Sequence, residues 1–256
     1  MIRPPRESLS EWLAAEPFAL AMSAGFFGFF AHTGALQTLV NRGLRPNRMS
    51  GASAGALVAG LYASGLEPSA IADGLLGLKR RDFWDPAPGL GILSGRRFRA
   101  LLEERLVVRD FSGCRTSVTV SVHDVLSRRP RALDHGDLAR AIHASCAVPV
   151  MFHPVWIAGR PYVDGGVTDR PGLSGVPQGA RLMCHHLASR SPWRRRNGLA
   201  LEVPRRANAV TLVIDGLPRI HPFALERGAV AFDRARAAME AALRQPIVDG
   251  VVRING

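Results

Sequence analysis

The chain has 256 residues, a net charge of +12, and 47% hydrophobic against 21% charged residues. This length fits one domain, and the apolar content suffices for a sizeable core, which excludes a disordered, collagen-like or disulfide-built protein. The three cysteines are too few and too scattered for a zinc cluster, and their odd number argues against an oxidised framework, so a reducing compartment is the simplest interpretation.

Residues 17–40 carry no formal charge and raise the question of a membrane span. Glycines and polar residues interrupt this stretch. We therefore expect a buried strand over 18–22, a turn over 23–28 and a helix over 30–42. Acidic residues lie just upstream and no small-residue cleavage site follows, so a signal peptide is not expected either.

Strand-like and helix-like patterns alternate along the rest of the chain. The expected elements are helices over 54–63, 69–78, 97–105, 138–145 and 223–244, strands near 48–49 and over 116–125, 181–186 and 210–214, a hairpin over 155–163, and irregular segments over 83–95 and 189–206. This alternation predicts an α/β fold with a mostly parallel central sheet flanked by helices on both faces, in a single domain over 1–256.

The positive charge is almost entirely arginine, because Lys79 is the only lysine. Guanidinium groups suit phosphate or carboxylate recognition, although a coding bias toward arginine explains the surplus equally well. The arginine runs are spread along the chain and no nucleic-acid motif organises them, so no nucleic-acid partner is expected. We expect the basic surface to contact an anionic membrane, and the alternative is a basic face that is only solvated.

The first chemical motif is a G-x-S-x-G pentapeptide formed by Gly51, Ala52, Ser53, Ala54 and Gly55. A sharp strand-to-helix turn of small residues exposes a serine hydroxyl, and the helix N-terminus supplies N–H groups beside the reacting oxygen. A short strand is expected before the motif and a helix after it. The competing interpretation is a plain helix N-cap serine.

Two further features are less specific when taken alone. The turn at Gly25, Phe26 and Phe27 follows the first strand, and its backbone N–H groups can converge on an oxyanion. Asp164, Gly165 and Gly166 follow an expected strand, where the aspartate can act as a base, although Asp-Gly is also a common turn signal.

In this order the motifs resemble the patatin-like phospholipase family over nearly the whole chain. The matching stretches also include 32–36, 91–95, 141–149 and 162–166. The resemblance implies a three-layer patatin fold and a lipolytic acyl hydrolase acting on phospholipids or lysophospholipids without a cofactor. Ser53 would attack the ester, Asp164 would take its proton, and an acyl-enzyme would form. The family's oxyanion hole maps to Gly25, Phe26 and Phe27, with support from Gly51, Ala54, Gly55, Gly165 and Gly166.

One departure affects the first turn, which usually reads G-G-G-x-R-G in the family. Here Ala24, Gly25 and Phe26 replace the three glycines, and Phe27 or Gly28 falls at the arginine position. Backbone N–H groups survive this change. A catalytically impaired lipid- or partner-binding module is therefore one alternative to the hydrolase.

A second alternative is an α/β-hydrolase triad, because His185, His186 and His221 all follow Asp164. His32 is expected to stabilise packing or the first turn. No metal motif is present and no metal is expected. Aromatic residues could form an apolar rim at the site, namely Phe83, Trp84 and Trp193. The expected location is cytoplasmic with peripheral membrane contact, and the sequence does not indicate an oligomeric state.

Overall fold

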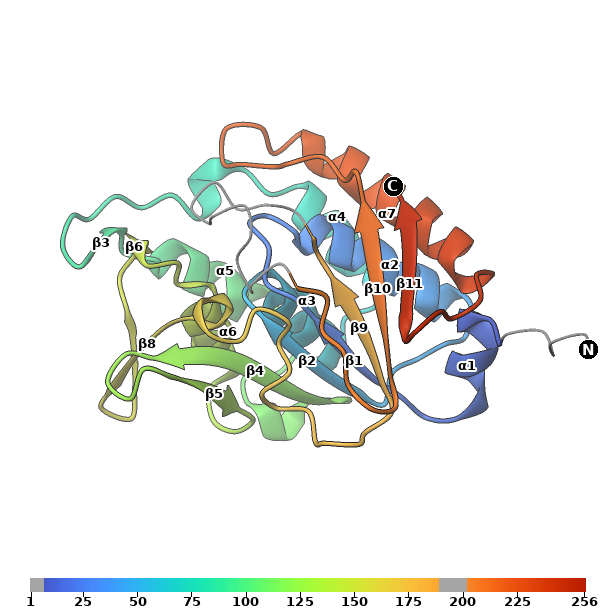
Figure 1. Ribbon diagram of the computed structural model, residues 1–256. Helices are drawn as coiled ribbons and strands as arrows, with labels where there is room; N and C mark the ends of the chain where they lie inside the picture. The colour runs from blue at the N-terminus through green and yellow to red at the C-terminus, as the bar shows by residue number, and fades with distance from the viewer. Residues whose placement is uncertain (1–6, 189–201) are drawn as a thin grey trace, which may run out of the picture.

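The computed structural model describes residues 7–188 and 202–256 (Figure 1). The α-helices are α1 (Leu9–Ala15), α2 (Phe29–Asn41), α3 (Ala54–Ala63), α4 (Pro68–Leu76), α5 (Arg96–Arg105), α6 (Leu138–Cys146) and α7 (Arg227–Leu243). The strands are β1 (Ala19–Met22), β2 (Arg48–Ala52), β3 (Gly91–Leu93), β4 (Ser117–Asp124), β5 (Arg129–Leu133), β6 (Val150–Phe152), β7 (Val155–Ile157), β8 (Arg160–Asp164), β9 (Leu182–His186), β10 (Ala209–Asp215) and β11 (Val251–Asn255). Short 3-10 helices are η1 (Arg80–Asp82), η2 (Phe111–Gly113) and η3 (Gly165–Val167).

Within the described residues, nine strands form one mixed sheet. Its order is β11-β10-β9-β1-β2-β4-β8-β7, and β5 also pairs with β4. The strands from β11 to β4 run parallel, whereas β5, β8 and β7 join by antiparallel pairing. The predicted α/β class and the mostly parallel sheet flanked by helices are confirmed.

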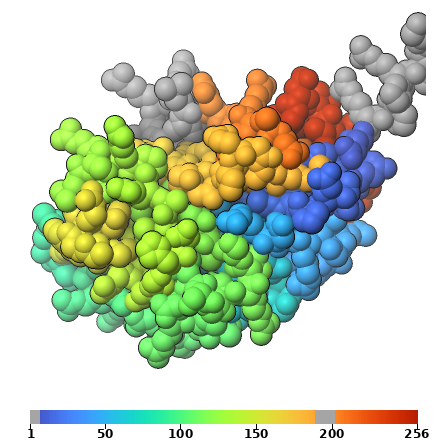
Figure 2. Space-filling model, turned by 90° about the horizontal axis from the view of Figure 1, so that it is seen from below, coloured from blue at the N-terminus to red at the C-terminus, as the bar shows by residue number. Residues whose placement is uncertain are grey.

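The two faces of the sheet are covered differently. All seven described α-helices contribute to one large apolar cluster, which includes Leu20 and Met49 from the sheet. On the opposite face a small cluster contains Ala19, Ala21, Val176, Leu182 and Cys184. In the described residues this second face is covered by the non-helical segment 168–181 rather than by the expected helices, because its alanine side chains let a chain segment pack closely. Figure 2 shows the gold atoms of this part of the chain between the green and blue surfaces.

Most predicted elements match the structure, and the differences have local causes. Residues 83–95 are not wholly irregular, because they contain strand β3. Strands β3 and β6 have three residues each, which is too short to show a hydrophobic period in the sequence. Strand β5 is arginine-rich and almost fully exposed, so no apolar alternation marks it. The last helix begins at Arg227 instead of residue 223, because Pro222 and the residues after it form turns. Helix α1 and strand β11 were not predicted, and residues 189–201 of the predicted basic segment lie outside the described part.

The predicted hairpin is confirmed and orients the end of β8. Ala158 and Gly159 both have positive φ, +48° and +76°, as a tight turn between antiparallel strands requires. Strand β8 therefore runs back along β4 and ends at Asp164. In the described part of the chain, no helix combines the length and the apolar character needed to cross a bilayer.

Helix α3 lies directly against the sheet because its first turn has a glycine. A Cβ on Gly55 would lie 2.0 Å from the carbonyl oxygen of Met22 in β1. No L side chain fits there unless the helix moves away from the strand.

We expect Gly55→Ala to lower the free energy of unfolding by about 1–3 kcal/mol, as other overpacked sites do. Urea unfolding followed by circular dichroism measures this. Gly77→Ala is the matched control, because Gly77 is exposed at the end of α4 with φ −77° and nothing nearer than 3.2 Å to an added Cβ. Equal stability of the two variants would contradict the packing argument.

Candidate active site

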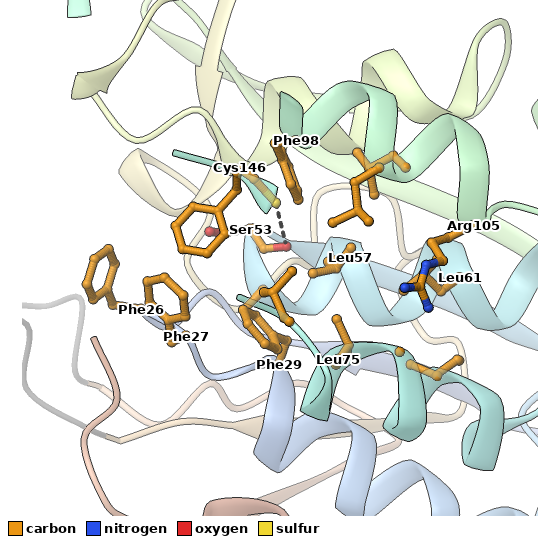
Figure 3. Close-up of a pocket in the computed structure, with 18 of the residues that line it drawn as sticks. Phe26, Phe27, Phe29, Ser53, Leu57, Leu61, Leu75, Phe98, Arg105 and Cys146 are labelled. Atoms are coloured by element: carbon orange, nitrogen blue, oxygen red, sulfur yellow. Dashed lines mark hydrogen bonds between the residues drawn. The ribbon is translucent and has the colours of Figure 1, made fainter. Parts of the chain in front are cut away.

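Ser53 lies at the sharp turn between β2 and α3 in a strained backbone conformation. Its φ is +52° and its ψ is −118°, a region that residues other than glycine rarely occupy. Its N–H donates to Ser145 Oγ at 2.8 Å, and Ser145 Oγ in turn donates to the carbonyl of Ser121 at 2.6 Å. The thiol of Cys146 donates to the carbonyl of Ser53 at 3.3 Å (Figure 3). Helix α6 therefore holds the strained serine through both of its backbone polar groups.

The glycines of the pentapeptide have a steric cause. A Cβ on Gly51 would lie 2.4 Å from the backbone of Gly55, so strand β2 and the first turn of α3 approach to contact distance. Gly172, with φ +73°, packs against the same turn, since its Cβ would lie 2.9 Å from the backbone nitrogen of Ala52. Larger residues at these positions would push the turn open.

An apolar cavity of about 120 Å³ opens at Ser53 (Figure 3). Its walls come from the first turn and from helices α3, α4 and α5, and its lining includes Gly25, Phe26, Phe27, Ser53, Ala54, Leu57, Leu61, Leu75, Phe83, Phe98 and Arg105. The predicted oxyanion residues and the predicted nucleophile thus border one space. Apolar cavities with few polar groups are typical of ligand sites.

The first turn is compact and packs against the residue that follows β9. The N–H of Gly28 donates to the carbonyl of Gly25 at 2.9 Å, and Phe27 has φ +52°. A Cβ on Gly25 or Gly28 would lie 2.6 or 2.2 Å from Leu187 Cδ1. These two glycines are therefore retained by packing even though the family's glycine-rich pattern is otherwise lost.

A buried histidine pair braces the start of this turn. His32 Nε2–H donates to the carbonyl of Ser23 at 2.8 Å, so its Nδ1 accepts a hydrogen from His185 Nδ1 at 2.9 Å. Ser23 Oγ also accepts from the N–H of Leu187 at 2.8 Å. The expected turn-stabilising role of His32 agrees with this geometry, and these two hydrogen bonds require the His32 ring to be neutral.

Arg170 is a brace that the sequence analysis missed. It is buried, its carbonyl accepts from the N–H of Ala24 at 2.7 Å, and its Nη2 donates to the carbonyl of Leu187 at 2.7 Å. An arginine from the segment after β8 thus contacts the first turn, which has no arginine of its own. The sequence does not indicate this contact, because Arg170 lies far from the first turn along the chain.

Asp164 ends β8 and is almost fully buried. Its Oδ1 accepts from the N–H of Gly166 at 2.7 Å, and its own N–H donates to the carbonyl of Ala147 at 2.9 Å. A Cβ on Gly165 would lie 2.1 Å from the carbonyl oxygen of Ser121, and one on Gly166 would lie 2.5 Å from the Cβ of Ala24. The two glycines after the aspartate let this strand end press against β4 and the first turn.

The sheet register brings Asp164 and Ser53 to the same edge. Ala52 pairs with Ser121, and Val122, the next residue of β4, pairs with Asp164. Ser53 and Asp164 therefore lie at the same edge of the sheet, on strands that are separated by β4 alone. Asp164 also lies near Cys146: burial raises the pKa of the Cys146 thiol, and the charge of Asp164 raises it further.

The three histidines of the alternative triad do not border the cavity. His185 is committed to His32, and His186 is buried on the same strand with its pKa lowered to about 4 by burial and by Arg170. His221 is exposed, and its Nδ1 accepts from the N–H of Phe223 at 3.2 Å. Within residues 7–188 and 202–256, no group of three or more His, Cys, Asp or Glu side chains is arranged to hold a metal ion.

The predicted aromatic rim is partly described. Phe83 is buried and lines the cavity, while Trp84 meets Phe223 edge-on with ring centroids 5.9 Å apart. The guanidinium of Arg80 lies 4.9 Å from the ring centroid of Phe223. Trp193 lies outside the described residues.

A serine held at positive φ in a strand–helix turn and facing an apolar cavity is typical of serine-hydrolase sites on α/β folds. Residues 20–175 match the sequence profile described as patatin-like phospholipase. The chain belongs to this family, which is one of lipolytic hydrolases.

Two relatives and one solved structure agree with this membership. Over 155 residues the chain is 29% identical to uncharacterized NTE family proteins of Mycobacterium bovis and Mycobacterium tuberculosis. The match covers 59% of this chain and 43% of those proteins, so it spans less than half of their length. The crystal structure of VipD from Legionella pneumophila is similar with a TM-score of 0.52 and 15% identity, covering 89% of this chain and 67% of that one, and shows a shared fold.

The buried histidines predict how stability depends on pH. Burial lowers the pKa of His32 from 6.5 to about 4, and burial also lowers the pKa of His185 well below its usual value. An unfolded histidine binds a proton near pH 6.5, whereas folded His32 does so only near pH 4, so the unfolded state holds more protons in between. Stability is therefore complete above about pH 6.5 and falls as the pH is lowered toward 4.

Between pH 7 and pH 4 the free energy of unfolding should fall less in His32→Gln than in the wild type. The difference should be about 3 kcal/mol, the contribution of one such group. Urea midpoints measured across this range test it. His135→Gln is the control, because the His135 side chain is 89% exposed. An unchanged slope in His32→Gln would mean that the pair does not stay neutral in the folded protein.

Proposed function

We propose that this protein is a lipolytic acyl hydrolase that cleaves carboxylic esters of phospholipids or lysophospholipids through Ser53 and Asp164. The observation that carries the proposal is the backbone of Ser53, whose positive φ lifts a serine out of the sheet at the opening of an apolar cavity. Strain of this kind persists only where the surroundings enforce it, and here Ser145 and Cys146 do so.

In the proposed reaction, Asp164 takes the hydroxyl proton of Ser53 while Ser53 Oγ attacks the ester carbonyl. The tetrahedral intermediate collapses to an acyl-enzyme, and Asp164 gives the proton to the leaving alcohol. Asp164 then takes a proton from water, which attacks the acyl carbonyl and releases the fatty acid. The proton returns to Ser53, so each turnover consumes one ester and one water.

Backbone donors supply the oxyanion stabilisation in this proposal. Phe26 keeps its N–H group although it stands at a position where the family usually has glycine, and Phe27 keeps its own. Gly25, Phe26 and Phe27 border the same cavity as Ser53. The first N–H groups of α3 begin at Ala54 and have no partner within the helix, so they add a positive helix end at the same place.

Cys146 does not compete as the nucleophile. Its pKa is raised well above the ordinary value by burial and by Asp164, so it remains a neutral thiol. Its proposed role is to hold the carbonyl of Ser53.

The rim of the cavity suits contact with an anionic membrane. Phe26 lines the cavity and is 45% exposed, and Phe223, which follows the lining residue Pro222, is 66% exposed. Arg80 lies against the ring of Phe223. An exposed aromatic residue beside a cation is suited to the headgroup region of a bilayer, and the net charge of +12 favours an anionic surface.

We expect Ser53→Ala and Asp164→Asn each to reduce kcat/KM for p-nitrophenyl esters at least about a thousandfold, since members of a catalytic unit fail together. A fluorophosphonate should label the wild type at Ser53, detected by mass spectrometry. Ser127→Ala and Asp233→Asn replace exposed residues of the same types and should retain activity.

The same experiment separates the alternatives. Folded wild-type protein without hydrolysis or labelling would support the binding module. Loss of activity on replacing His185, His186 or His221, with Asp164→Asn still active, would support the triad.

The proposed membrane contact predicts a preference for esters in anionic vesicles over soluble esters. Phe223→Asp should lower the ratio of hydrolysis on anionic vesicles to hydrolysis of a soluble ester by about fivefold or more, because it puts a charge where the bilayer would be contacted. Co-sedimentation with phosphatidylglycerol vesicles should fall in parallel. Leu126→Asp changes a 62% exposed leucine outside the cavity lining and is the control. Equal ratios in both variants would mean that this rim does not face the membrane.

A further inference from the structure

The cavity extends along helix α3 away from Ser53. Ala54, Leu57 and Leu61 follow the serine at helical spacing and all line the cavity, which places them on one face of the helix. Helices α4 and α5 supply the opposite walls through Ile71, Leu75, Phe98, Leu101 and Leu102. Figure 3 shows Leu57 and Leu61 in sequence between Ser53 and Arg105.

The size of this space is limited. Leu61 lies eight residues after Ser53, and eight steps of 1.5 Å per helical residue span about 12 Å. An extended hydrocarbon chain advances about 1.3 Å per carbon, so this length holds about nine carbons.

Arg105 stands at the far end of the cavity, where its side chain is exposed to solvent. It is the last residue of α5 and is the charged residue in the lining. Within the described residues, the guanidinium of Arg105 forms no hydrogen bond and no ion pair, and the other residues of the sequence contain no acidic side chain. A Cβ on Gly74 would lie 2.6 Å from Arg105 Nη1, so a glycine in α4 makes room for the guanidinium.

We propose that this cavity is an acyl subsite selective for chains of about nine or ten carbons that end in a carboxylate, which Arg105 binds. The inference rests on the proposed function, because it names the acyl group that Ser53 would receive. The apolar walls hold the methylenes, and the guanidinium supplies paired donors for the terminal carboxylate. The substrate class is the esters of medium-length dicarboxylic acids.

The test compares p-nitrophenyl decanoate with the mono-p-nitrophenyl ester of decanedioic acid at pH 7.5. The measured quantity is the ratio of kcat/KM for the dicarboxylate ester to kcat/KM for decanoate. Arg105→Gln should lower this ratio about tenfold, and Arg105→Lys should restore part of it. Gly74→Val should also lower it, because it displaces the guanidinium and removes no charge.

Two controls make the result specific. Arg96→Gln changes an exposed arginine of the same helix outside the cavity lining and should keep the ratio. The mono-ester of butanedioic acid carries its carboxylate too close to the ester to reach Arg105, so its ratio to butyrate should not respond to Arg105→Gln. Equal losses on both ten-carbon esters, or equal responses of the short and long dicarboxylate esters, would overturn the proposal.

A binding measurement keeps the inference separate from the proposed function. In Ser53→Ala, calorimetry should show that Arg105→Gln weakens decanedioate binding about tenfold more than decanoate binding. If the wild type hydrolyses no ester but this difference is found, the proposed reaction fails and the subsite stands. If hydrolysis occurs and neither ratio changes, the subsite fails and the reaction stands.

Discussion

The close approach of helix α3 to strands β1 and β2 is the constraint on which the site depends. At Gly55 and Gly51 backbone meets backbone at distances that leave no space for a side chain. This contact forces the chain to reverse within one residue, and Ser53 takes the positive φ that results. The hydrogen bonds from Ser145 and Cys146 then hold the strained turn, so packing and polar contacts enforce the same conformation.

The sequence was informative where a residue type has one steric explanation. The pentapeptide around Ser53, the two glycines after Asp164 and the Ala158-Gly159 turn were all recognised because small residues recur where backbone must turn or touch. Helix α3 was predicted with the bounds that the structure has. These small residues allow the strained backbone of Ser53. Strands β2, β4 and β8 then lie side by side in a register that pairs Val122 with Asp164.

Other parts of the site could not be predicted because their partners lie far apart in the chain. His32 and His185 come together only after β9 pairs with β1, and the sequence around either residue does not indicate a hydrogen bond between them. Arg170 reaches the first turn from the segment after β8, so the loss of the usual arginine there looked uncompensated. The short strands β3 and β6 have too few residues for a period, and their pairing across the fold is what makes them strands.

The order in which the chain is made has a consequence for the proposed dyad. Ser53 belongs to the parallel part of the sheet, whereas Asp164 arrives on a hairpin that joins much later by antiparallel pairing with β4. During synthesis, a nascent polypeptide therefore carries the proposed nucleophile before the proposed base. Truncated products that end before β8 would lack the proposed base and would be harmless to surrounding membranes, so chemical competence would require the chain to extend through β8.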